Sequence, residues 1–405
     1  MAAPFRTRLG RASRWALILC LLLLPVVTVW NLGARAMGLP WIASLGVLDG
    51  VTAAKPAPGW SWASFKAKTL QDWAGAAVSE AVPLRPLLIQ LNNEVLYDLF
   101  GVIDAPKLIE GENGELVEKQ YLTEYCSRTM SSGDQKADEL IPKLAPIQSY
   151  FRERGRLFFY LITPSKLATK PDGFLRGHSC PNSPREREAY VPRLVERLRQ
   201  AGIEVVDAAT PIHRAQGRHP VDMFPLRGIH WNDLGVALAT QEIIAKINTL
   251  AGREVLPKMD WRMEVRNEAT GMDLDIGALL NLLVPRTRDR VPHVDYALAR
   301  PCDGLPGATL DAAMVGSSFI GQPGTALIWG NCLKKLQRHH YLSRLREGLD
   351  PSMTKVNLTD ADLLPLRDAE LLILEENESF REESNYVGRL LRLLQTGSTA
   401  AAPTG

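Results

Sequence analysis

The feature that most constrains this chain is a short apolar run at residues 314–320 that ends in a Gly-Ser-Ser turn. The run predicts a buried strand, and the turn presents the hydroxyl of Ser318 at the carboxyl edge of a sheet, where α/β folds bind ligands. A serine is a weak nucleophile unless a base lies within hydrogen-bond reach. His230, in the upstream block Gly228-Ile229-His230-Trp231-Asn232, is the candidate base. The pair therefore predicts serine-dependent acyl chemistry.

Each of these residues also has a plainer interpretation. Ser318 would then only cap the helix that follows the turn, because serines are good N-caps. His230 would be a partly buried histidine that is hydrogen-bonded to the backbone. A third group normally orients a catalytic histidine, and Asp222 and Asp233 are the nearest acids. Asp233 could instead cap the helix expected after it.

The N-terminus determines the expected compartment. Four arginines between residues 6 and 14 precede an apolar stretch at residues 15–30. Basic residues before such a stretch stay in the cytoplasm while the remainder crosses the membrane. We expect an uncleaved inner-membrane anchor within residues 1–36 and a periplasmic remainder. A signal peptide cleaved near Ala36 is the alternative.

Composition limits the class of protein. The chain is 46% hydrophobic and 23% charged, which is an ordinary globular balance that permits a real core. The net charge of +2 gives no support for nucleic-acid binding.

The cysteines are consistent with an oxidising compartment. Cys20 lies in the apolar stretch, and four cysteines remain. We expect the pairs Cys126–Cys180 and Cys302–Cys332, although four cysteines allow three pairings. Because no pair has the Cys-x-x-Cys spacing of zinc sites, we expect no metal, and no cofactor is indicated.

Hydrophobic patterning predicts an α/β fold with a mainly parallel sheet and helices on both faces. Residues 61–100 form two helices separated at Val82-Pro83, and residues 108–117 form a hairpin. Residues 252–310 resemble an insertion. Buried strands are expected at 157–162, 313–315, 326–329 and 371–374, a short strand at 204–206, and helices at 186–199 and 233–250. The expected organisation is a basic stub with an anchor (1–36), a linker and helical lead-in (37–104), the α/β domain (105–395) and a disordered tail (396–405).

Further polar residues follow predicted strands. Asn377, after the strand at 371–374, is placed to donate to an oxyanion, with Ser317 as a supporting group. A loop asparagine that closes a turn is the plainer alternative. Lys166 and Trp231 are candidate substrate-binding residues, although Lys166 would equally suit a solvated loop.

Five motifs in order resemble a known family over residues 73–380. They are Val82-Pro83-Leu84-Arg85, the hairpin 108–117 with Glu115 where the family has tryptophan, Pro164-Ser165-Lys166, His230-Trp231-Asn232 with Gly235, and Gly316-Ser317-Ser318-Phe319. The chain resembles the SGNH-hydrolase-like domain of the alginate O-acetyltransferase AlgX/AlgJ type, which also occurs in acetylation proteins of other bacterial exopolysaccharides. Asn377-Glu378 is similar to the SGNH Asn-Asp block.

The resemblance implies a circularly permuted SGNH-like fold and a polysaccharide O-acetyltransferase. Ser318 would carry the acetyl group, His230 would activate it, and a membrane-bound acyltransferase partner would supply acetyl groups. One residue departs from the pattern. Where the family has aspartate two residues before the histidine, this chain has Gly228.

Two alternatives to the acetyltransferase therefore stay open. A carbohydrate acetyl esterase would run the same chemistry to water. A catalytically weak polysaccharide-binding or assembly protein would have kept the fold alone, and the Gly228 departure favours this second alternative.

Overall fold

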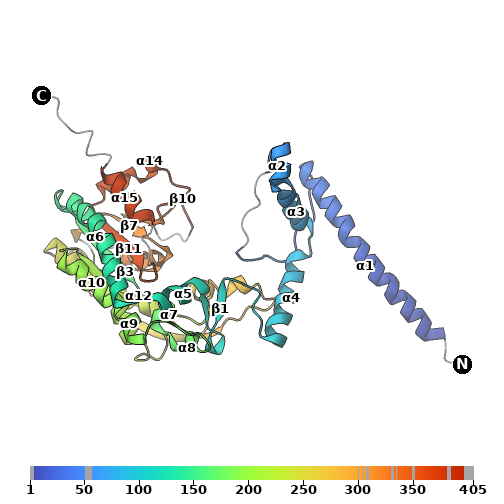
Figure 1. The fold of residues 1–405 in the computed structure, drawn as a ribbon, viewed down its shortest axis with the longest axis horizontal. Helices are drawn as coiled ribbons and strands as arrows, with labels where there is room; N and C mark the ends of the chain where they lie inside the picture. The colour runs from blue at the N-terminus through green and yellow to red at the C-terminus, as the bar shows by residue number, and fades with distance from the viewer. Residues whose placement is uncertain are drawn as a thin grey trace. The chain divides into compact units, whose positions relative to one another are not determined.

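The computed structural model divides the chain into two compact units, which we call the N-terminal unit (Met1–Pro106 with Gly277–Arg286) and the sheet unit (Lys107–Ile276 with Thr287–Gly405). Figure 1 shows the helices and strands of both. The structure describes residues 4–50, 57–299, 301–302, 304–306, 310–329, 333, 335–348, 352–380 and 385–395.

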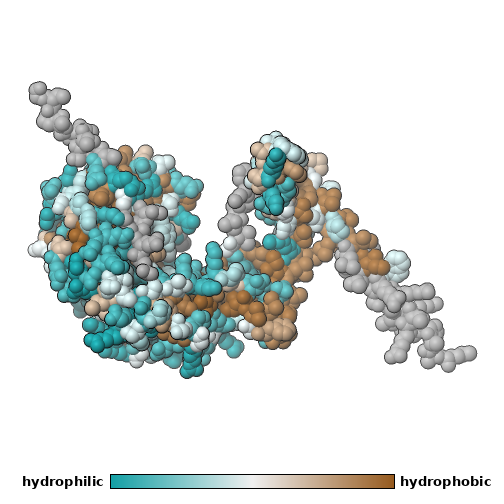
Figure 2. Space-filling model, viewed as in Figure 1, coloured by the Kyte–Doolittle hydropathy of each residue, from teal (hydrophilic) through white to brown (hydrophobic). Residues whose placement is uncertain are grey.

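The N-terminal unit is helical. Its helices are α1 (Pro4–Ala36), α2 (Trp62–Lys66), α3 (Thr69–Ala81) and α4 (Arg85–Phe100). The expected break between α3 and α4 is confirmed, because Val82 is extended and Pro86 occupies the first turn of α4, where proline fits. Many apolar side chains on α4 are exposed, Leu99 and Phe100 most of all, and brown surface gathers there in Figure 2.

The N-terminal residues do not confirm the expected membrane helix. Residues 4–36 form the single helix α1. Within the described part of the chain, however, no helix combines the length and the apolarity that crossing a bilayer requires.

A seven-stranded sheet forms the centre of the sheet unit. Its order is β10-β9-β8-β7-β11-β3-β4. Strands β8, β7, β11, β3 and β4 are parallel, whereas β9 and β10 pair antiparallel at one edge. The expected mainly parallel sheet is therefore confirmed. The strands are β3 (Leu157–Thr163), β4 (Val205–Asp207), β7 (Asp311–Gly316), β8 (Lys335–His340), β9 (Arg344–Glu347), β10 (Lys355–Val356) and β11 (Leu371–Asn377).

Both faces of this sheet are covered by helices, as expected. Because side chains alternate along a strand, Ile373 of β11 packs into one core and Leu372 and Leu374 pack into the other. The first core includes residues of α12 (Asp233–Ala251) and α13 (Gly321–Ile328). The second includes residues of α6 (Met130–Arg152), α10 (Tyr190–Gln200) and α15 (Asn385–Gln395).

The remaining elements of the sheet unit are short or lie outside the main sheet. Two antiparallel hairpins are β1 (Leu108–Glu110) with β2 (Leu116–Glu118), and β5 (Met259–Glu268) with β6 (Arg288–Leu298). Short α-helices are α5 (Lys119–Ser127), α7 (Lys166–Thr169), α8 (Asp172–Leu175), α9 (Pro184–Glu188), α11 (Ala209–Ala215) and α14 (Asp360–Leu363), and 3-10 turns include η1 (Glu112–Gly114), η2 (Gly271–Leu274), η5 (Ser318–Ile320) and η7 (Leu364–Asp368).

Two sequence expectations need correction. The apolar run at 326–329 is not a strand, because residues up to Ile328 belong to α13, the helix that crosses from β7 to the parallel strand β8. A short, uniformly apolar run fits a buried strand and a buried helix equally well, so the sequence pattern does not distinguish them. The helix expected at 186–199 is two helices, α9 and α10, with Ala189 between them. The region 252–310 contains the β5–β6 hairpin.

One of the two expected disulfides is confirmed. Cys126 and Cys180 are bonded at an S–S distance of 2.05 Å. Such a bond is typical of proteins that fold in an oxidising, extracytoplasmic compartment. The expected partner of Cys302, Cys332, and the tail 396–405 lie outside the described residues.

Candidate active site

The nucleophile turn, residues 316–320, lies where β7 ends. Ser317 caps the 3-10 turn η5, because its Oγ accepts from the backbone N–H of Phe319 at 3.2 Å. Glycine is required at 316, since a β-carbon there would collide with the side chains of Glu375 and Ile320. Ser318 follows the cap and is half-buried, so its hydroxyl stays within reach of a ligand.

His230 lies directly before α12 and faces the serine. Its Nε2 is 2.7 Å from Ser318 Oγ. The imidazole packs against the ring of Phe319, with centroids 4.6 Å apart, and the residue is only 6% exposed. Asn232 begins α12 by accepting from the backbone N–H of Gly235, which fixes the chain just after His230. The two residues that the sequence singled out are therefore brought together.

The third member of this chain of hydrogen bonds is Asp275, a residue that sequence reasoning missed. Its Oδ2 lies 2.5 Å from His230 Nδ1, and its Oδ1 accepts from the backbone N–H of Ile229 at 2.8 Å. Because a carboxylate only accepts, Nδ1 carries the proton and Nε2 is left to accept from Ser318 Oγ. The arrangement is a Ser-His-Asp triad in geometry.

Asp275 comes from the tip of the β5–β6 hairpin, after η2. The only local signal in the sequence is a pair of acids, Asp273 and Asp275, inside a segment with no readable periodicity. Nothing in that pattern places the segment beside residue 230, which is 45 positions away. The missed residue depends on a tertiary contact, which local sequence does not encode.

The backbone packed against Gly228 leaves no room for a side chain there, so the acid that contacts His230 comes from another segment. A β-carbon at this position would lie 2.6 Å from the backbone oxygen of Met272 and 3.1 Å from that of Asp273. Contacts below 3.0 Å are not tolerated by a rigid backbone. The segment that carries Asp275 therefore passes where a side chain at 228 would stand.

The acids expected to orient His230 are engaged in other contacts. Asp222 pairs with Lys170 at 2.7 Å and accepts from Gln216 at 2.6 Å. Asp233 is the first residue of α12, where a negative charge suits the helix N-terminus, and it lies 3.9 Å from His293 Nδ1. Burial raises the pKa of the Asp233 carboxyl.

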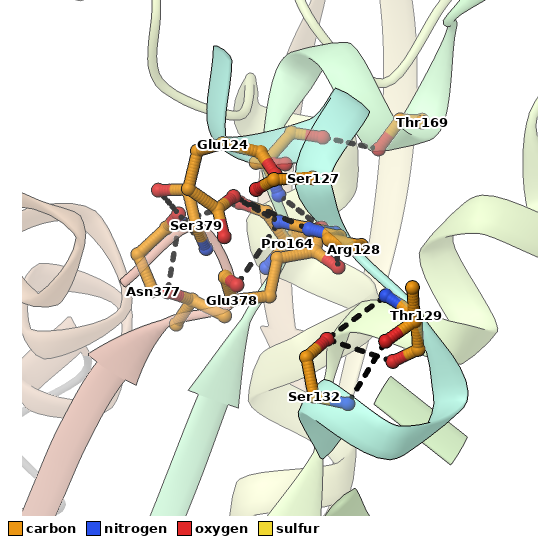
Figure 3. Close-up of polar contacts among 12 residues, drawn as sticks. Glu124, Ser127, Arg128, Thr129, Ser132, Pro164, Thr169, Asn377, Glu378 and Ser379 are labelled. Atoms are coloured by element: carbon orange, nitrogen blue, oxygen red, sulfur yellow. Dashed lines mark hydrogen bonds and ion pairs between the residues drawn. The ribbon is translucent and has the colours of Figure 1, made fainter. Parts of the chain in front are cut away.

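Asn377 and Ser317, the candidates for oxyanion contact, are both held within the protein. Asn377 donates to the backbone oxygen of Pro164 at 2.8 Å and accepts from the hydroxyl of Ser379 at 2.6 Å. Figure 3 shows this amide at the end of β11, turned into the network that also contains Glu378 and Arg128. The Ser317 backbone N–H donates to the carboxylate of Glu375 at 2.7 Å.

The donors that do face the nucleophile are the Ser318 backbone N–H and Tyr341. The N–H donates to the Tyr341 hydroxyl oxygen at 3.2 Å, and that hydroxyl donates to Ser318 Oγ at 3.4 Å. Tyr341 has a φ of 55° and Leu342 a φ of 50°, a left-handed conformation that non-glycine residues rarely adopt. Such conformations cluster at functional sites, so the turn after β8 is a second marker of this edge.

Lys166 and Trp231, the predicted substrate-binding residues, are both fully buried. The Lys166 ammonium donates to the backbone oxygens of Pro225 and Leu226 at 2.7 Å and Gly228 at 3.0 Å. Burial lowers its pKa to about 7. These bonds hold the loop that leads into His230. Trp231 is 0% exposed and packs near Phe319 in the core.

A pocket of about 320 Å³ opens beside Ser318. Aromatic and basic side chains line it, together with Ser318 itself, and they include Tyr296, Trp329, Tyr341, Arg344 and Arg346. His340 also lines it, and burial together with Arg346 lowers the pKa of that imidazole to about 4, which makes it a weak base. Aromatic faces with a few polar groups suit a saccharide or acyl ligand.

Among the described residues, no group of three or more His, Cys, Asp or Glu side chains is arranged to hold an ion.

Comparisons with known proteins identify a family for this chain. Residues 121–364 match the family of the SGNH hydrolase-like domain of acetyltransferase AlgX. No curated protein sequence matches significantly.

Similar solved structures include three bacterial proteins. The O-acetyltransferase domain of Pseudomonas putida AlgJ is 15% identical, with a TM-score of 0.46, over 72% of this chain and 100% of that one. Pseudomonas aeruginosa AlgX is 12% identical, with a TM-score of 0.45, over 73% and 68%. Bacillus cereus PatB1 with a sulfonyl adduct is 11% identical, with a TM-score of 0.40, over 68% and 96%. The family match covers more than half of the chain, and on that match the chain belongs to the family of SGNH hydrolase-like domains of the AlgX acetyltransferase type.

Proposed function

We propose that this protein is a periplasmic serine O-acetyltransferase that moves acetyl groups through an acetyl-Ser318 intermediate onto hydroxyls of an exopolysaccharide. The observation that carries the proposal is the continuous chain from Ser318 Oγ through His230 to Asp275, with distances of 2.7 and 2.5 Å, at the edge of a pocket. The disulfide supports the extracytoplasmic location.

In the first half of the reaction, Ser318 Oγ attacks the carbonyl carbon of the acetyl donor. His230 Nε2 takes the Oγ proton, and Asp275 stabilises the resulting imidazolium. The tetrahedral oxyanion accepts hydrogen bonds from the Ser318 N–H and the Tyr341 hydroxyl. Collapse breaks the bond to the donor, whose leaving group takes the proton from His230, and acetyl-Ser318 remains.

In the second half, a sugar hydroxyl attacks acetyl-Ser318. His230 accepts its proton, the second tetrahedral species collapses, and the proton returns to Ser318 Oγ. The acetyl ester then belongs to the saccharide. The proposed source of the acetyl groups is a membrane-bound acyltransferase partner.

A non-catalytic binding role loses its main support. That alternative rested on Gly228, and an aspartate from another segment stands at His230 Nδ1. The esterase alternative uses the same residues and differs only in the acceptor, which is water.

The test uses the chain with p-nitrophenyl acetate as donor and acidic or neutral oligosaccharides as acceptors. Peptide mass spectrometry would locate the acetyl group, and chromatography would separate acetylated saccharide from free acetate. We expect acetyl-Ser318 in the wild type and none in Ser318→Ala or His230→Ala. Acetate without acetylated saccharide would identify an esterase, and no label on folded protein would overturn the proposal.

A further inference from the structure

A second pocket of the sheet unit, which we call the Arg187 pocket, has a volume of about 400 Å³ and holds none of the triad residues. Besides Arg187, its lining includes Thr169, Thr210 and Glu378, which come after β3, β4 and β11 in the chain. The carboxyl ends of parallel strands are where α/β folds bind ligands, and pockets of this size hold small molecules. The reaction proposed above makes no use of this pocket.

Arg187, in the short helix α9, brings a buried cation to the pocket. The residue is 5% exposed, and its Nη1 donates to the backbone oxygen of Asn182. Its Cζ lies 5.0 Å from the centroid of the Tyr125 ring, and the guanidinium also donates to the Tyr125 hydroxyl. Among the described residues, no carboxylate forms an ion pair with this guanidinium, and its Nε has no hydrogen-bond partner.

A buried arginine without an anionic partner is unusual in a protein. Arginine is almost never fully buried unless it is paired, because removal of its charge from water is costly. Arg128, in the same lining, follows this rule. It is 1% exposed and pairs with Glu124 at 3.0 Å and with Glu378 at 3.1 Å, as Figure 3 shows. The contrast indicates that the counter-ion of Arg187 is a ligand.

The other charged groups of the lining are paired or lie in solvent. Glu378 accepts from His213 Nε2 at 2.8 Å and from Arg128 Nη1 at 3.1 Å. Although burial opposes ionisation, His213 and Arg128 lower the pKa of the Glu378 carboxyl to about 2, so it stays an anion with its own partners. Arg214 and Glu188 are exposed and carry opposite charges. The charge left to be compensated is the buried guanidinium.

The unpartnered polar atoms of the pocket suit a carboxylate. A guanidinium presents N–H donors in a planar fork that matches a carboxylate, and such charge-assisted bonds are stronger than neutral ones. The Oγ1 of Thr210 is also buried and without a hydrogen-bond partner among the described residues. Its hydroxyl can donate to the second oxygen of the same carboxylate or bond another hydroxyl of the ligand.

The disulfide fixes the wall that carries Arg187. Cys126, next to Tyr125 in α5, is bonded to Cys180 across a separation of 54 residues. Asn182 donates through its Nδ2 to the backbone oxygen of Cys126 at 3.1 Å. The backbone oxygen of the same asparagine accepts from Arg187. The guanidinium is therefore held before a ligand arrives, which reduces the ordering cost of binding.

We propose that the Arg187 pocket is a second ligand site, which binds a carboxylate group through Arg187 and Thr210. A sugar acid and a small free carboxylate both carry this group, and the test distinguishes them. The site goes beyond the proposed acetyl transfer, because the Ser318–His230–Asp275 triad lies outside its lining. Its test therefore needs no acetyl donor and no turnover.

The test is isothermal titration calorimetry of the full chain with sodium glucuronate, sodium acetate and glucose at constant ionic strength. Glucuronate differs from glucose by its carboxylate, and acetate carries a carboxylate without a sugar. We expect a carboxylate to bind and glucose not to bind. Binding of glucuronate alone would identify a sugar acid, and equal affinity for acetate would identify a small carboxylate. No binding of either anion, or equal binding of glucose, would overturn the proposal.

Two variants place the binding in this pocket. Arg187→Met keeps the length of the side chain and removes its charge, so the affinity should fall about tenfold or more, as when a hydrogen bond to a charged group is lost. Thr210→Val keeps the shape and removes the hydroxyl, and it should cost about three- to tenfold. Without ligand, Arg187→Met should not lower the Tm, because it removes an unpaired buried charge. A lower Tm with unchanged affinity would show a purely structural arginine and overturn the proposal.

Matched controls remove arginines elsewhere in the sheet unit. Arg344→Met takes a guanidinium from the pocket beside Ser318, and Arg193→Met takes one from a surface pair with Asp134. Both should bind the carboxylate as the wild type does. Loss of binding in Arg344→Met with none in Arg187→Met would place the carboxylate beside Ser318 and contradict the assignment.

Discussion

The nucleophile turn and the acid-bearing segment build one site in opposite ways. The nucleophile turn, residues 316–320, continues directly from a central strand and is fixed by one buried neighbour, Glu375, which accepts from both the N–H and the hydroxyl of Ser317. The acid-bearing segment, residues 270–286, is an excursion from a hairpin outside the main sheet. The sheet therefore positions Ser318, whereas packing between segments that are distant in the sequence positions Asp275.

This difference indicates which residues of such a site can be supplied by another segment while the catalytic chemistry is kept. The geometry of Ser318 depends on Gly316, where a β-carbon would collide with its neighbours, and on the buried carboxyl of Glu375. The acid needs only to present a carboxylate oxygen to His230 Nδ1, and any segment that reaches this point can do so. Gly228 carries no carboxylate, and Asp275 from another segment supplies the one that contacts His230 Nδ1.

Asp275→Asn should have the largest effect on the acid side of this comparison. The amide would favour the wrong imidazole tautomer, and kcat should fall by about 10⁴-fold with the fold intact. Steady-state kinetics with p-nitrophenyl acetate would measure the loss. Asp233→Asn and Asp222→Asn are matched controls that should retain activity within about twofold, because neither reaches His230. A larger loss in Asp233→Asn than in Asp275→Asn would contradict the assignment.

Tyr341→Phe tests the nucleophile side. It removes the hydroxyl near Ser318 but keeps the ring that packs on Tyr386, 6.3 Å away. We expect kcat to fall about 10²-fold with KM little changed, as when one oxyanion donor is lost. Tyr296→Phe alters a hydroxyl in the same pocket and should cost less than about threefold. Equal effects of the two variants would show that Tyr341 only lines the pocket.

Gly228→Ala tests the contact between the two regions. The added methyl group would push on the backbone at Met272 and Asp273, and the unfolding free energy should fall by about 1–3 kcal/mol. Displacement of the acid-bearing segment should also lower kcat about tenfold. Gly252→Ala at the end of α12 adds a methyl group where no atom lies within 4 Å, although its φ of 63° adds strain of its own. A loss of stability in both variants with a loss of kcat only in Gly228→Ala is the expected pattern.

Substitution of Glu375 should have the smallest effect on kcat, and its effect on the unfolding free energy should depend on pH. Burial raises the pKa of this carboxyl to about 7, above the usual 4.5. The folded protein then holds a proton that the unfolded chain has lost, so the unfolding free energy falls as pH rises from about 4.5 to about 7. Glu375→Gln should remove up to about 3 kcal/mol of this slope while changing kcat less than about threefold. Denaturant unfolding of both proteins across this pH range would measure it, and parallel curves would count against the raised pKa.

The sequence allowed the sheet half of the molecule to be predicted. Residues 157–162 and 371–374 are continuous apolar runs, and the pattern that identifies a buried parallel strand is local. The same locality located Ser318 and His230, because each lies in a short motif. The strand predicted at residues 326–329 was wrong, because a buried helix and a buried strand have the same apolar pattern over four positions.

The acid and the roles of several polar residues could not be predicted in this way. Asp275 depends on how the β5–β6 hairpin packs beside the His230 loop, and no periodicity in residues 252–310 indicates that contact. Lys166 reads as a loop lysine, yet three backbone oxygens accept from its ammonium. Asn377 reads as an oxyanion donor, yet its amide is used to join the ends of β11 and β3. Tertiary partners decide all three.

The central claim is that Asp275 holds the proton-bearing Nδ1 of His230. Proton NMR of the chain labelled with ¹⁵N-histidine tests it without any substrate. We expect a strongly deshielded, ¹⁵N-coupled Nδ1 proton in the wild type and in Asp233→Asn, and no such proton in Asp275→Ala or His230→Ala. A resonance that persists in Asp275→Ala but disappears in Asp233→Asn would contradict the account and return the role to the acid beside the histidine in sequence.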